Sequence, residues 1–311
     1  VTALATALRS LPITDDHKQH LHHLQTLKSS LFSARIEGNT LSLIKAKDID
    51  LSHPKDVSQL EVSNLLKAEA HLKKLVIPLT EKQLLELHTI VLKGLSPNAG
   101  SFRHESSAIF DGVGNIVYLT PSPSEMKNMV TVLLEQINAP IAPSDRYLLT
   151  IAACHYYFEK THPFLDGNGR VGRILIQYQL RQSQLFNSFI LPIDEYFNLN
   201  KAEYYYYLEK NTRQIEGWIS FFLEGLSWAM TKILEDAKAL VTEKYQLRLL
   251  PRRQEILEII KDHPQSSLDF ICRRFPTIPK RTIQYDVQQL IKENVVIKLG
   301  KTRGVVYQAA S

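Results

Sequence analysis

The fold is decided by the stretch HPFLDGNGRVGR, which runs from His162 to Arg173. A helical hydrophobic pattern ends at Thr161, Pro163 interrupts it, and a second helical pattern begins near Val171. Between the two patterns the chain turns through two glycines. Backbone N–H groups of such a turn, together with the N-terminus of the next helix, bind phosphate oxygens. The sequence therefore predicts an anion-binding loop between two helices.

The glycine-rich half of this stretch is suited to binding phosphate. Gly167 and Gly169 permit positive φ and the close approach of an anion, and Asn168 adds side-chain hydrogen bonds. Arg170 and Arg173 lie three residues apart, so both can reach a polyphosphate from the first turns of the helix.

The other half supplies a base and a metal ligand. His162 stands at the mouth of the loop, and its unperturbed pKa lies near neutrality, which suits a group that takes a proton from an attacking hydroxyl. Asp166 offers the hard oxygen that a phosphate-bound Mg²⁺ prefers. Phe164 is expected to anchor the loop in the core. Each residue alone has a structural explanation, as a cap, a turn or a surface charge, and only their conjunction favours a catalytic site.

On these residues the chain resembles the Fic family, whose signature HPFx(D/E)GNGRxxR is matched at every fixed position. Members are helical, and most transfer the AMP part of ATP to a Ser, Thr or Tyr hydroxyl of a target protein. The resemblance implies ATP as substrate and Mg²⁺ as cofactor, with His162 as general base and Asp166 as metal ligand. It also implies that Arg173 holds the γ-phosphate and that the phosphates are cradled by Gly167, Asn168, Gly169 and Arg170. Gly167 stands where the phosphate-transferring Doc branch departs from the glycine pattern, so kinase-like chemistry is disfavoured.

A second motif closes the helix that begins near Asp16. Glu37-Gly38 predicts a helix C-terminus with a glycine cap. The segment also resembles the inhibitory motif of the family, (S/T)xxxE(G/N), through Ser33, Glu37 and Gly38. This resemblance implies the class that carries its inhibitory helix N-terminal to the catalytic loop, in which Glu37 pairs with Arg173 and excludes the γ-phosphate. The expected resting state is inactive, and whether Glu37 also supports removal of AMP stays open.

The helical pattern stops between residues 102 and 121. Ile109-Phe110 and the run 116–119 flank a glycine-containing turn at 111–115, which predicts a β-hairpin. By resemblance this hairpin is the flap that aligns the target segment by strand pairing, and an ordinary surface hairpin is the alternative. Tyr204 and Tyr205 resemble the paired tyrosines at the adenine end of the pocket, with a plain core role as the alternative.

Most of the first 250 residues have helical periodicity. It predicts helices over residues 16–32, 54–74, 80–92, 124–136, 144–161, 171–184, 201–211 and 217–249. The predicted fold class is mainly α: a Fic-type helical domain with a β-hairpin flap, followed by a small winged helix-turn-helix domain. The predicted domains are an N-terminal helical region with the inhibitory helix (1–95), a Fic catalytic core (96–225), a helical linker (226–250) and the winged domain (251–311).

The winged domain is predicted from its pattern and its charge. Helical runs at 252–261, 267–274 and 280–294 precede β-rich runs at 295–299 and 305–308, which are joined by a glycine-containing turn. Residues 251–311 hold 11 Lys or Arg and 6 Asp or Glu, a net charge of +5, whereas residues 1–250 hold 26 of each sign. DNA is a possible partner of this unit, and the side chains suited to it are Lys280, Arg281, Thr282, Gln284, Tyr285 and Gln288, with Lys301 and Arg303 in the wing. Docking of a protein and a solvated lysine-rich surface are the alternatives.

Composition excludes several other classes of protein. At about 150 residues per domain, 311 residues favour about two domains, and the 44% hydrophobic and 22% charged content is that of a folded globular protein. The two cysteines exclude a disulfide framework and a Cys-rich zinc site. No apolar run approaches the ~18 residues of a membrane span, and the polar opening segment, broken by Pro12, does not resemble a signal sequence. We therefore expect a soluble cytoplasmic protein with no membrane partner.

Two functions from different classes follow. The first is a self-inhibited protein adenylyltransferase that modifies a target protein. The alternative is a DNA-binding transcriptional regulator that uses the Fic-like domain as a nucleotide-responsive switch. The complete loop motif favours the enzyme, because a pure sensor does not need His162. A homodimer is an expectation from the family resemblance alone.

Overall fold

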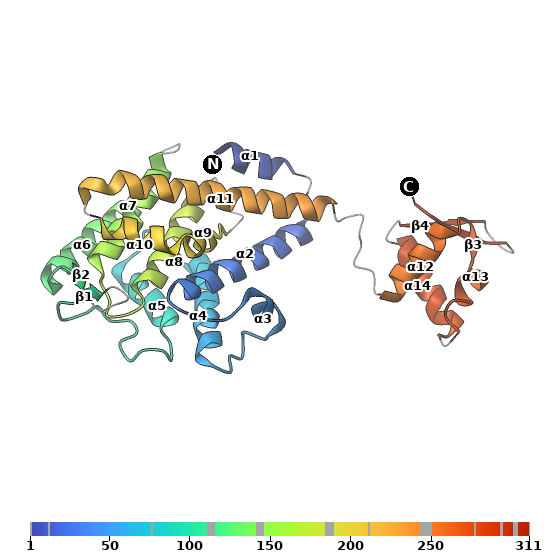
Figure 1. The fold of residues 1–311 in the computed structure, drawn as a ribbon, viewed down its shortest axis with the longest axis horizontal. Helices are drawn as coiled ribbons and strands as arrows, with labels where there is room; N and C mark the ends of the chain where they lie inside the picture. Colours follow the sequence, from blue (N-terminus) through green and yellow to red (C-terminus); the bar gives the residue numbers. More distant parts are fainter. Residues whose placement is uncertain are drawn as a thin grey trace. The chain divides into compact units, whose positions relative to one another are not determined.

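The computed structural model describes residues 2–11, 13–75, 77–110, 116–140, 146–183, 190–210, 212–242, 251–276, 278–292, 295–300 and 304–310. The chain divides into two compact units, Val1–Val241 and Thr242–Ser311. The first unit is built of helices with one β-hairpin, and the second is a small body of helices and short strands (Figure 1). This mainly helical architecture confirms the fold class that the sequence predicts.

Helices are the main secondary structure of the first unit. They are α1 (Thr2–Ser10), α2 (Asp15–Ile36), α3 (Leu43–Asp48), α4 (Val57–His71), α5 (Glu81–Val91), α6 (Pro123–Ile137), α7 (Arg146–Thr161), α8 (Asn168–Gln182), α9 (Ile193–Leu199), α10 (Lys201–Glu209) and α11 (Ile215–Thr242), with 3₁₀ turns η1 (Leu72–Lys74) and η2 (Thr212–Gln214). Each expected helix is present, although most of the ends are shifted, and α1, α3 and α9 are absent from the prediction. In the described part of the chain, no helix has both the length and the apolar character to cross a membrane.

The long helix α2 is packed against α4 and α9. Thr14 is its N-cap. Two of its buried polar side chains reach other elements: Gln25 Nε2 donates to Asp236 Oδ2 of α11 (2.9 Å), and Ser29 Oγ donates to Asp194 Oδ2 of α9 (2.7 Å). Buried polar groups require such partners. These bonds therefore fix the rotation of α2, and with it the direction of the residues at its C-terminal end.

Two apolar clusters form the core of the first unit. One is built around α4, α5 and α6 and includes Phe164, and the other is built around α7, α9 and α11 and includes Trp218. Helix α8 contributes to both, with Leu175 in the first cluster and Ile176 in the second. Because α8 begins directly after the glycine-rich loop, burial on both of its faces holds that loop in place.

Residues 226–241 belong to the body of the first unit. The sequence predicts a helical linker over 226–250, but Leu226, Met230, Ile233 and Ala237 of α11 are buried in the second apolar cluster. Apolar residues at this spacing cover one face of a helix, so the linker prediction is wrong for this half. Residues 243–250 lie outside the described residues. The first apolar cluster also crosses the boundary predicted between residues 95 and 96.

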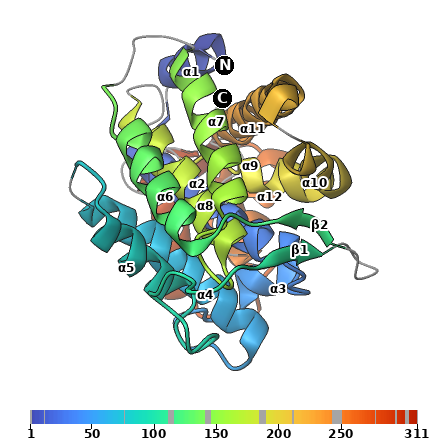
Figure 2. The same cartoon turned by 90° about the vertical axis from the view of Figure 1, so that its left-hand side faces the viewer.

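The expected hairpin is present on the first unit. Strand β1 (Ala108–Phe110) pairs antiparallel with β2 (Ile116–Leu119), with Ile109 opposite Tyr118 and an irregularity between Ile109 and Phe110. The turn predicted at 111–115 lies outside the described residues. Figure 2 shows the two strands side by side at the edge of the first unit.

The second unit has its own core. Its elements are α12 (Pro251–Asp262), β3 (Ser266–Ser267), α13 (Leu268–Cys272), α14 (Lys280–Lys292), β4 (Val296–Leu299) and β5 (Val306–Ala309), and the sheet order is β3-β5-β4, antiparallel throughout. Ile256, Ile283 and Leu290 are fully buried between the helices and the sheet. The two-residue strand β3 is absent from the prediction, and the wing residues Lys301 and Arg303 lie outside the described residues.

Candidate active site

The glycine-rich loop is closed by its own side chains. Gly167 has a φ of +79° and caps α8, which begins at Asn168, and this left-handed conformation favours glycine. The Asn168 side chain donates to the Phe164 carbonyl (2.8 Å) and accepts from the Phe164 N–H (2.9 Å). Phe164 is fully buried and stacks on His88 with 3.7 Å between ring centroids. Burial of this ring, worth about 2 kcal/mol, anchors the loop as the sequence predicts.

Two details of the loop differ from expectation. The Asn168 side chain is bonded to both backbone groups of Phe164, so it braces the turn in addition to any contact with a phosphate. Gly169 has no positive φ, since α8 begins three residues before the predicted start at Val171. A Cβ on Gly169 would instead collide with the carboxylate of Glu37. Glycine is needed at position 169 for the close approach of that side chain.

His162 lies just before the loop in a left-handed conformation, with a φ of +47°, which is uncommon for a residue with a side chain. The buried Arg103 holds it there, because its Nε donates to the His162 carbonyl (2.8 Å) and its Nη2 donates to the Pro121 carbonyl (2.6 Å). Burial lowers the pKa of His162, since a low-dielectric environment disfavours the charged imidazolium. The ring is neutral at pH 7 and is able to accept a proton.

Asp166 and Arg170 are paired at the start of α8. Arg170 Nη2 donates to Asp166 Oδ1 (2.8 Å), and Nη1 donates to Glu61 Oε1 of α4 (3.0 Å). The same Asp166 oxygen accepts from the Gly167 N–H (2.6 Å). The Asp166 side chain is nevertheless 54% exposed. One of its oxygens therefore fixes the loop while the carboxylate stays open to a ligand from solvent.

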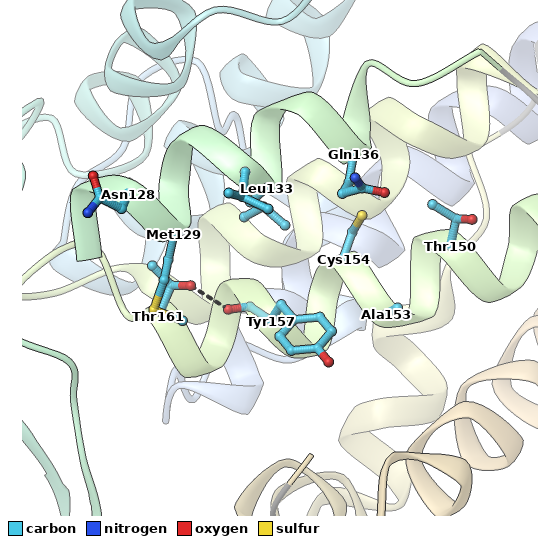
Figure 3. A pocket seen from close by; sticks show the side chains of 10 residues that line it. Asn128, Met129, Leu133, Gln136, Thr150, Ala153, Cys154, Tyr157 and Thr161 are labelled. Atoms are coloured by element: carbon cyan, nitrogen blue, oxygen red, sulfur yellow. Dashed lines mark hydrogen bonds between the residues drawn. The ribbon is translucent and has the colours of Figure 1, made fainter. Parts of the chain in front are cut away.

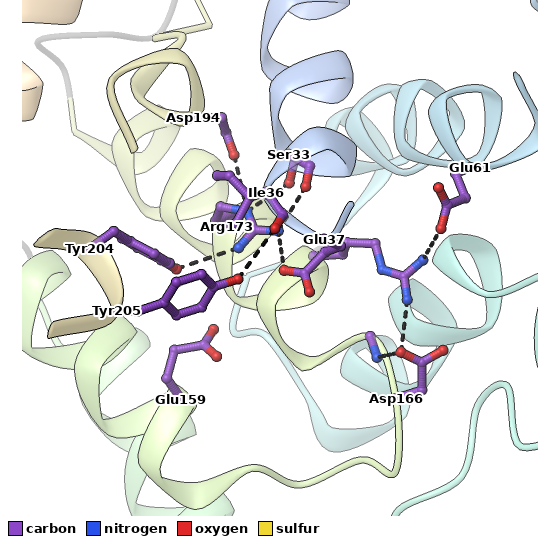
Figure 4. Close-up of polar contacts among 12 residues, drawn as sticks. Ser33, Ile36, Glu37, Glu61, Glu159, Asp166, Arg173, Asp194, Tyr204 and Tyr205 are labelled. Atoms are coloured by element: carbon purple, nitrogen blue, oxygen red, sulfur yellow. Dashed lines mark hydrogen bonds and ion pairs between the residues drawn. The ribbon is translucent and has the colours of Figure 1, made fainter. Parts of the chain in front are cut away.

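Arg173 is buried between two carboxylates (Figure 4). Its Nη2 donates to Glu37 Oε1 (2.8 Å) and to the Ser33 carbonyl (2.9 Å), and its Nε donates to Ser33 Oγ (2.8 Å). Asp194 Oδ1 lies 3.4 Å from the same Nε. The expected end of α2 is confirmed, because Glu37 is its C-cap and Gly38 has a φ of +102°. The end of α2 thus meets the first turns of α8.

Both tyrosines predicted near the pocket lie beside Arg173. The Tyr204 hydroxyl is 3.4 Å from Arg173 Nη1 and 2.9 Å from His155 Nε2, and the side chain is buried in the core. Tyr205 is 37% exposed, and its hydroxyl donates to the Ile36 carbonyl of α2 (3.3 Å). Tyr204 therefore belongs to the core as well as to the site, whereas Tyr205 is accessible at its edge.

Glu159 of α7 is a largely buried acidic residue on the same side of the site as Tyr204 and Tyr205 (Figure 4). The Glu159 side chain is 12% exposed and packs over Gly172, where a Cβ would collide with it. Burial raises the pKa of Glu159 to about 8, because a carboxylate is disfavoured away from water. Glu159 is mostly protonated at neutral pH, so its proximity to Glu37 in Figure 4 does not bring two negative charges together.

The hairpin is anchored next to His162. The Tyr118 hydroxyl donates to the Lys160 carbonyl (3.1 Å), and the Lys160 ammonium lies 4.3 Å from the centre of the Tyr118 ring. Arg103 links the His162 carbonyl to Pro121, which follows β2. The C-terminal end of α7 and the hairpin are thereby tied to each other at the position of the candidate base.

Three residues of the site are not predicted by the sequence motifs. Arg103, Glu61 and Asp194 come from separate elements and reach the loop only through the fold. The sequence holds a weak signal for Asp194, because it stands in the apolar run 190–197, where an acidic residue is seldom buried without a partner. Nothing comparable distinguishes Glu61 on α4.

An apolar pocket of about 570 Å³ lies beside the site between α6 and α7 (Figure 3). It extends to Thr161, the residue before His162, and its apolar lining consists of Met129, Val132, Leu133, Ala153, Cys154 and Tyr157. A smaller hollow shares Asn128 and Met129 with it and continues to Tyr118 and Leu119 of β2. The apolar surface therefore runs from the hairpin along α6.

Comparisons with known proteins agree with the loop motif. Residues 78–180 match the model of the Fic/DOC family. The chain is 30% identical over 220 residues to protein adenylyltransferase fic-1 of Caenorhabditis elegans, covering 64% of this chain and 41% of that protein. It is 24% identical over 217 residues to protein adenylyltransferase Fic of Drosophila willistoni, covering 66% and 39%. The chain thus spans about two fifths of the length of these curated relatives.

Solved structures share the fold. A Fic family protein from Desulfovibrio desulfuricans G20 matches with a TM-score of 0.64 at 18% identity, over 99% of this chain and 94% of that one. Fic-1 from C. elegans matches with a TM-score of 0.61 at 19% identity, over 78% and 71%. The fold and the loop define a helical protein built around a glycine-rich turn that starts a buried helix. Residues 78–180 of the chain carry a Fic/DOC family domain.

Proposed function

We propose that the chain is a self-inhibited protein adenylyltransferase, which transfers AMP from ATP to a Ser, Thr or Tyr hydroxyl of a target protein. The observation that carries the proposal is the contact between the two motifs: Glu37 Oε1 lies 2.8 Å from Arg173 Nη2 within a site that also holds His162 and the loop. The relatives named protein adenylyltransferase support the class of reaction.

The loop supplies what nucleotidyl transfer requires, namely positioning, a base and neutralisation of the leaving group. His162 takes the proton of the hydroxyl while the hydroxyl oxygen forms a bond to the α-phosphorus. The bond from that phosphorus to the bridging oxygen breaks, and pyrophosphate leaves with the electron pair. Arg170 and the first backbone N–H groups of α8 neutralise its oxygens, and Arg173 holds the γ-phosphate.

Glu37 opposes this arrangement. The Arg173 guanidinium is already bonded to Glu37 and Ser33 and lies next to Asp194. A γ-phosphate at the same place would put further negative charge beside Glu37 in a site shielded from water, where like charges repel strongly. ATP therefore reaches a productive position only after the end of α2 moves or Glu37 is removed.

Mg²⁺ fits the residues present. In proteins Mg²⁺ is commonly held by one or two carboxylates together with water and substrate phosphates, and Asp166 offers a half-exposed carboxylate next to the proposed phosphate cradle. No group of three or more His, Cys, Asp or Glu forms a complete metal cage within the described ranges. Asp166 would hold the ion with the phosphates, and the bound ion would neutralise part of their charge.

The remaining contacts support an assignment of the two ends of the site. We place the target segment along the hairpin, because Tyr118 and Arg103 tie that hairpin to the His162 turn. The adenine end lies toward Tyr205, which is accessible next to Arg173. Tyr204 supports this end from the core.

Label transfer from α-labelled ATP with Mg²⁺ tests the proposal, using wild type, Glu37→Gly and His162→Ala with lysate proteins as acceptors. We expect weak labelling in the wild type, labelling about tenfold or more higher in Glu37→Gly, as for a coupling of 1–3 kcal/mol, and none in His162→Ala. Equal labelling of wild type and Glu37→Gly would exclude the inhibitory role of Glu37. No labelling in any of the three would reject the adenylyltransferase.

A second candidate function rests on α14. Its residues Arg281, Gln284, Tyr285 and Gln288 are exposed at a spacing that forms one helix face, while Ile283 is buried behind them. Three helices followed by the β4–β5 hairpin support a winged helix-turn-helix interpretation, in which such a face reads DNA. In this alternative the chain is a transcriptional regulator and the Fic domain is a nucleotide-responsive switch.

A further inference from the structure

A polar pocket of about 240 Å³ lies in the first unit, away from the glycine-rich loop. One wall is the N-terminal half of α2, and the others come from the end of α4 with η1, the end of α8, and Ile190; its polar lining consists of Gln19, His22, His23, Thr26, Glu69, Lys73 and Arg181. At about 30 Å³ per water molecule, the space is that of several waters or one small solute, and it is too small for a nucleotide.

Three groups in this pocket are buried without a hydrogen-bond partner in the described structure: His22 Nδ1, Arg181 Nη1 and Glu69 Oε2. Glu69 is only 4% exposed. Groups of this kind cost free energy unless a ligand or ordered water satisfies them. The three residues that carry these atoms come from three different helices and line one pocket, so the pocket brings together side chains that can bind a ligand.

The charges of the pocket favour an anion. Burial lowers the pKa of His22, and the nearby positive charges of Lys73 and Arg181 lower it further. Burial also raises the pKa of Glu69 to about 8, so its carboxyl is mostly a neutral hydrogen-bond donor at pH 7. With Glu69 neutral, no ionised carboxylate of the lining offsets the positive charges of Lys73 and Arg181. A bound anion reduces the repulsion between these two charges.

We propose that this pocket binds a compact oxyanion, such as a phosphate or a small dicarboxylate, between α2 and the ends of α4 and α8. Lys73 and Arg181 supply the charge, His22 supplies a ring N–H, and the Glu69 carboxyl donates a hydrogen bond to a ligand oxygen. The bound anion bridges α2 to the body of the first unit. Since Glu37 and Ser33 lie at the other end of α2, the anion favours the position in which α2 holds Arg173, and this consequence rests on the proposed function.

Binding is measured by calorimetry with inorganic phosphate and with malonate, at matched ionic strength in sodium chloride. We expect saturable binding in the wild type, a loss of affinity of about fivefold in Lys73→Gln, as for one exposed charge, and of tenfold or more in Arg181→Gln, as for a hydrogen bond to a buried charge. Lys74→Gln is the matched control, because Lys74 is exposed next to Lys73 and does not line the pocket. Lys73 is exposed as well, so its variant should fold normally.

Phosphate has a competing site at the glycine-rich loop, and Arg170→Gln distinguishes the two. Binding that persists in Arg170→Gln and weakens in Lys73→Gln supports the pocket. Binding that is lost in Arg170→Gln and is unchanged in Lys73→Gln, or no saturable binding below about 10 mM, overturns the proposal. Neither result depends on adenylyltransferase activity, so the pocket and the proposed function fail independently.

Amide hydrogen exchange tests the bridge to α2. We expect phosphate to slow exchange along residues 19–36 of the wild type about threefold or more and to have no such effect in Lys73→Gln, because ligand binding stabilises the state that it bridges. Phosphate binding without protection of α2 would overturn the link to the inhibitory helix.

Discussion

Arg173 contacts two carboxylates that differ in their exposure to solvent. This difference predicts opposite effects when each carboxylate is removed. Glu37 lies at a helix end and is 32% exposed in its side chain, whereas Asp194 is 1% exposed and is fixed by Ser29. In Glu37→Gly we expect Asp194 to keep Arg173 oriented for the γ-phosphate. Adding Asp194→Asn should raise KM for ATP about tenfold, as for the loss of a charge-assisted contact, and steady-state label transfer measures it. An unchanged KM would show that Asp194 does not position Arg173.

The burial of His162 predicts the pH dependence of the reaction. A base acts in its neutral form, and burial lowers the pKa of His162 below its ordinary value. Glu37 opposes this shift, so its removal lowers the pKa of His162 further. For Glu37→Gly the rate should rise with pH in the acidic range, with the midpoint of the rise below pH ~6.5, the ordinary pKa of His. A midpoint at or above that value would contradict a buried neutral base.

At the scale of single residues, the sequence predicts the site only where its members are contiguous. His162 to Arg173 form one loop, and their pattern can be interpreted without the fold. Asn168 shows the limit of that approach, because an amide in a glycine-rich turn suits a phosphate and a backbone brace equally well, and only its bonds to Phe164 show that it braces the turn. Arg103, Glu61 and Asp194 contact the site through long-range packing, which a local pattern does not contain.

At the scale of elements, the proposed inhibition depends on the end of α2, and a substitution at Gly38 tests it. Its φ of +102° is strained for any other residue, although a Cβ there would meet no neighbouring atom. We expect Gly38→Ala to lower the free energy of unfolding by about 1 kcal/mol and to raise basal label transfer a few-fold, because the strain is relieved by displacing Glu37. Chemical denaturation and label transfer measure the two effects.

Gly304 provides the matched control for this substitution. It has a φ of +92°, it also has open space around the position of a Cβ, and it belongs to the second unit. Gly304→Ala should carry a similar backbone cost while label transfer stays at the wild-type level. Equal activation by both substitutions would show that general loosening, and not the end of α2, raises activity.

Long elements are also the ones that the sequence predicts well. Residues of α7 such as Ile151 and Phe158 recur on one face and are buried, which makes the helical period visible. Helix α9 spans only Ile193–Leu199, about two turns, which is too short for a helical period to be recognised. The first half of the linker predicted over residues 226–250 is wrong because the sequence shows a long apolar helix but does not show which elements pack against it.

At the scale of the whole molecule, the net positive charge comes from residues 251–311, which hold 11 Lys or Arg and 6 Asp or Glu, and this leads to a test of DNA binding. The exposed face of α14 includes Arg281, whereas the ammonium of Lys280 is 2.5 Å from Asp269 Oδ1 and is partly neutralised. We expect Arg281→Gln to weaken DNA binding several-fold and to reduce the slope of log affinity against log salt by about one counterion. Lys280→Gln should have a smaller effect, because its charge is already shared with Asp269.

The control for this test is Lys261→Gln, which removes an equal charge from α12 at a residue paired with Glu258. Fluorescence anisotropy with a labelled duplex at several salt concentrations compares the variants. If Arg281→Gln and Lys261→Gln weaken binding equally, only the net charge of the unit attracts DNA, and α14 is not a reading helix. If neither the wild type nor any variant binds DNA, the exposed face of α14 is better interpreted as a site for a protein partner. It holds one arginine, one tyrosine and two glutamines, and Tyr and Arg often supply most of the binding energy in protein interfaces.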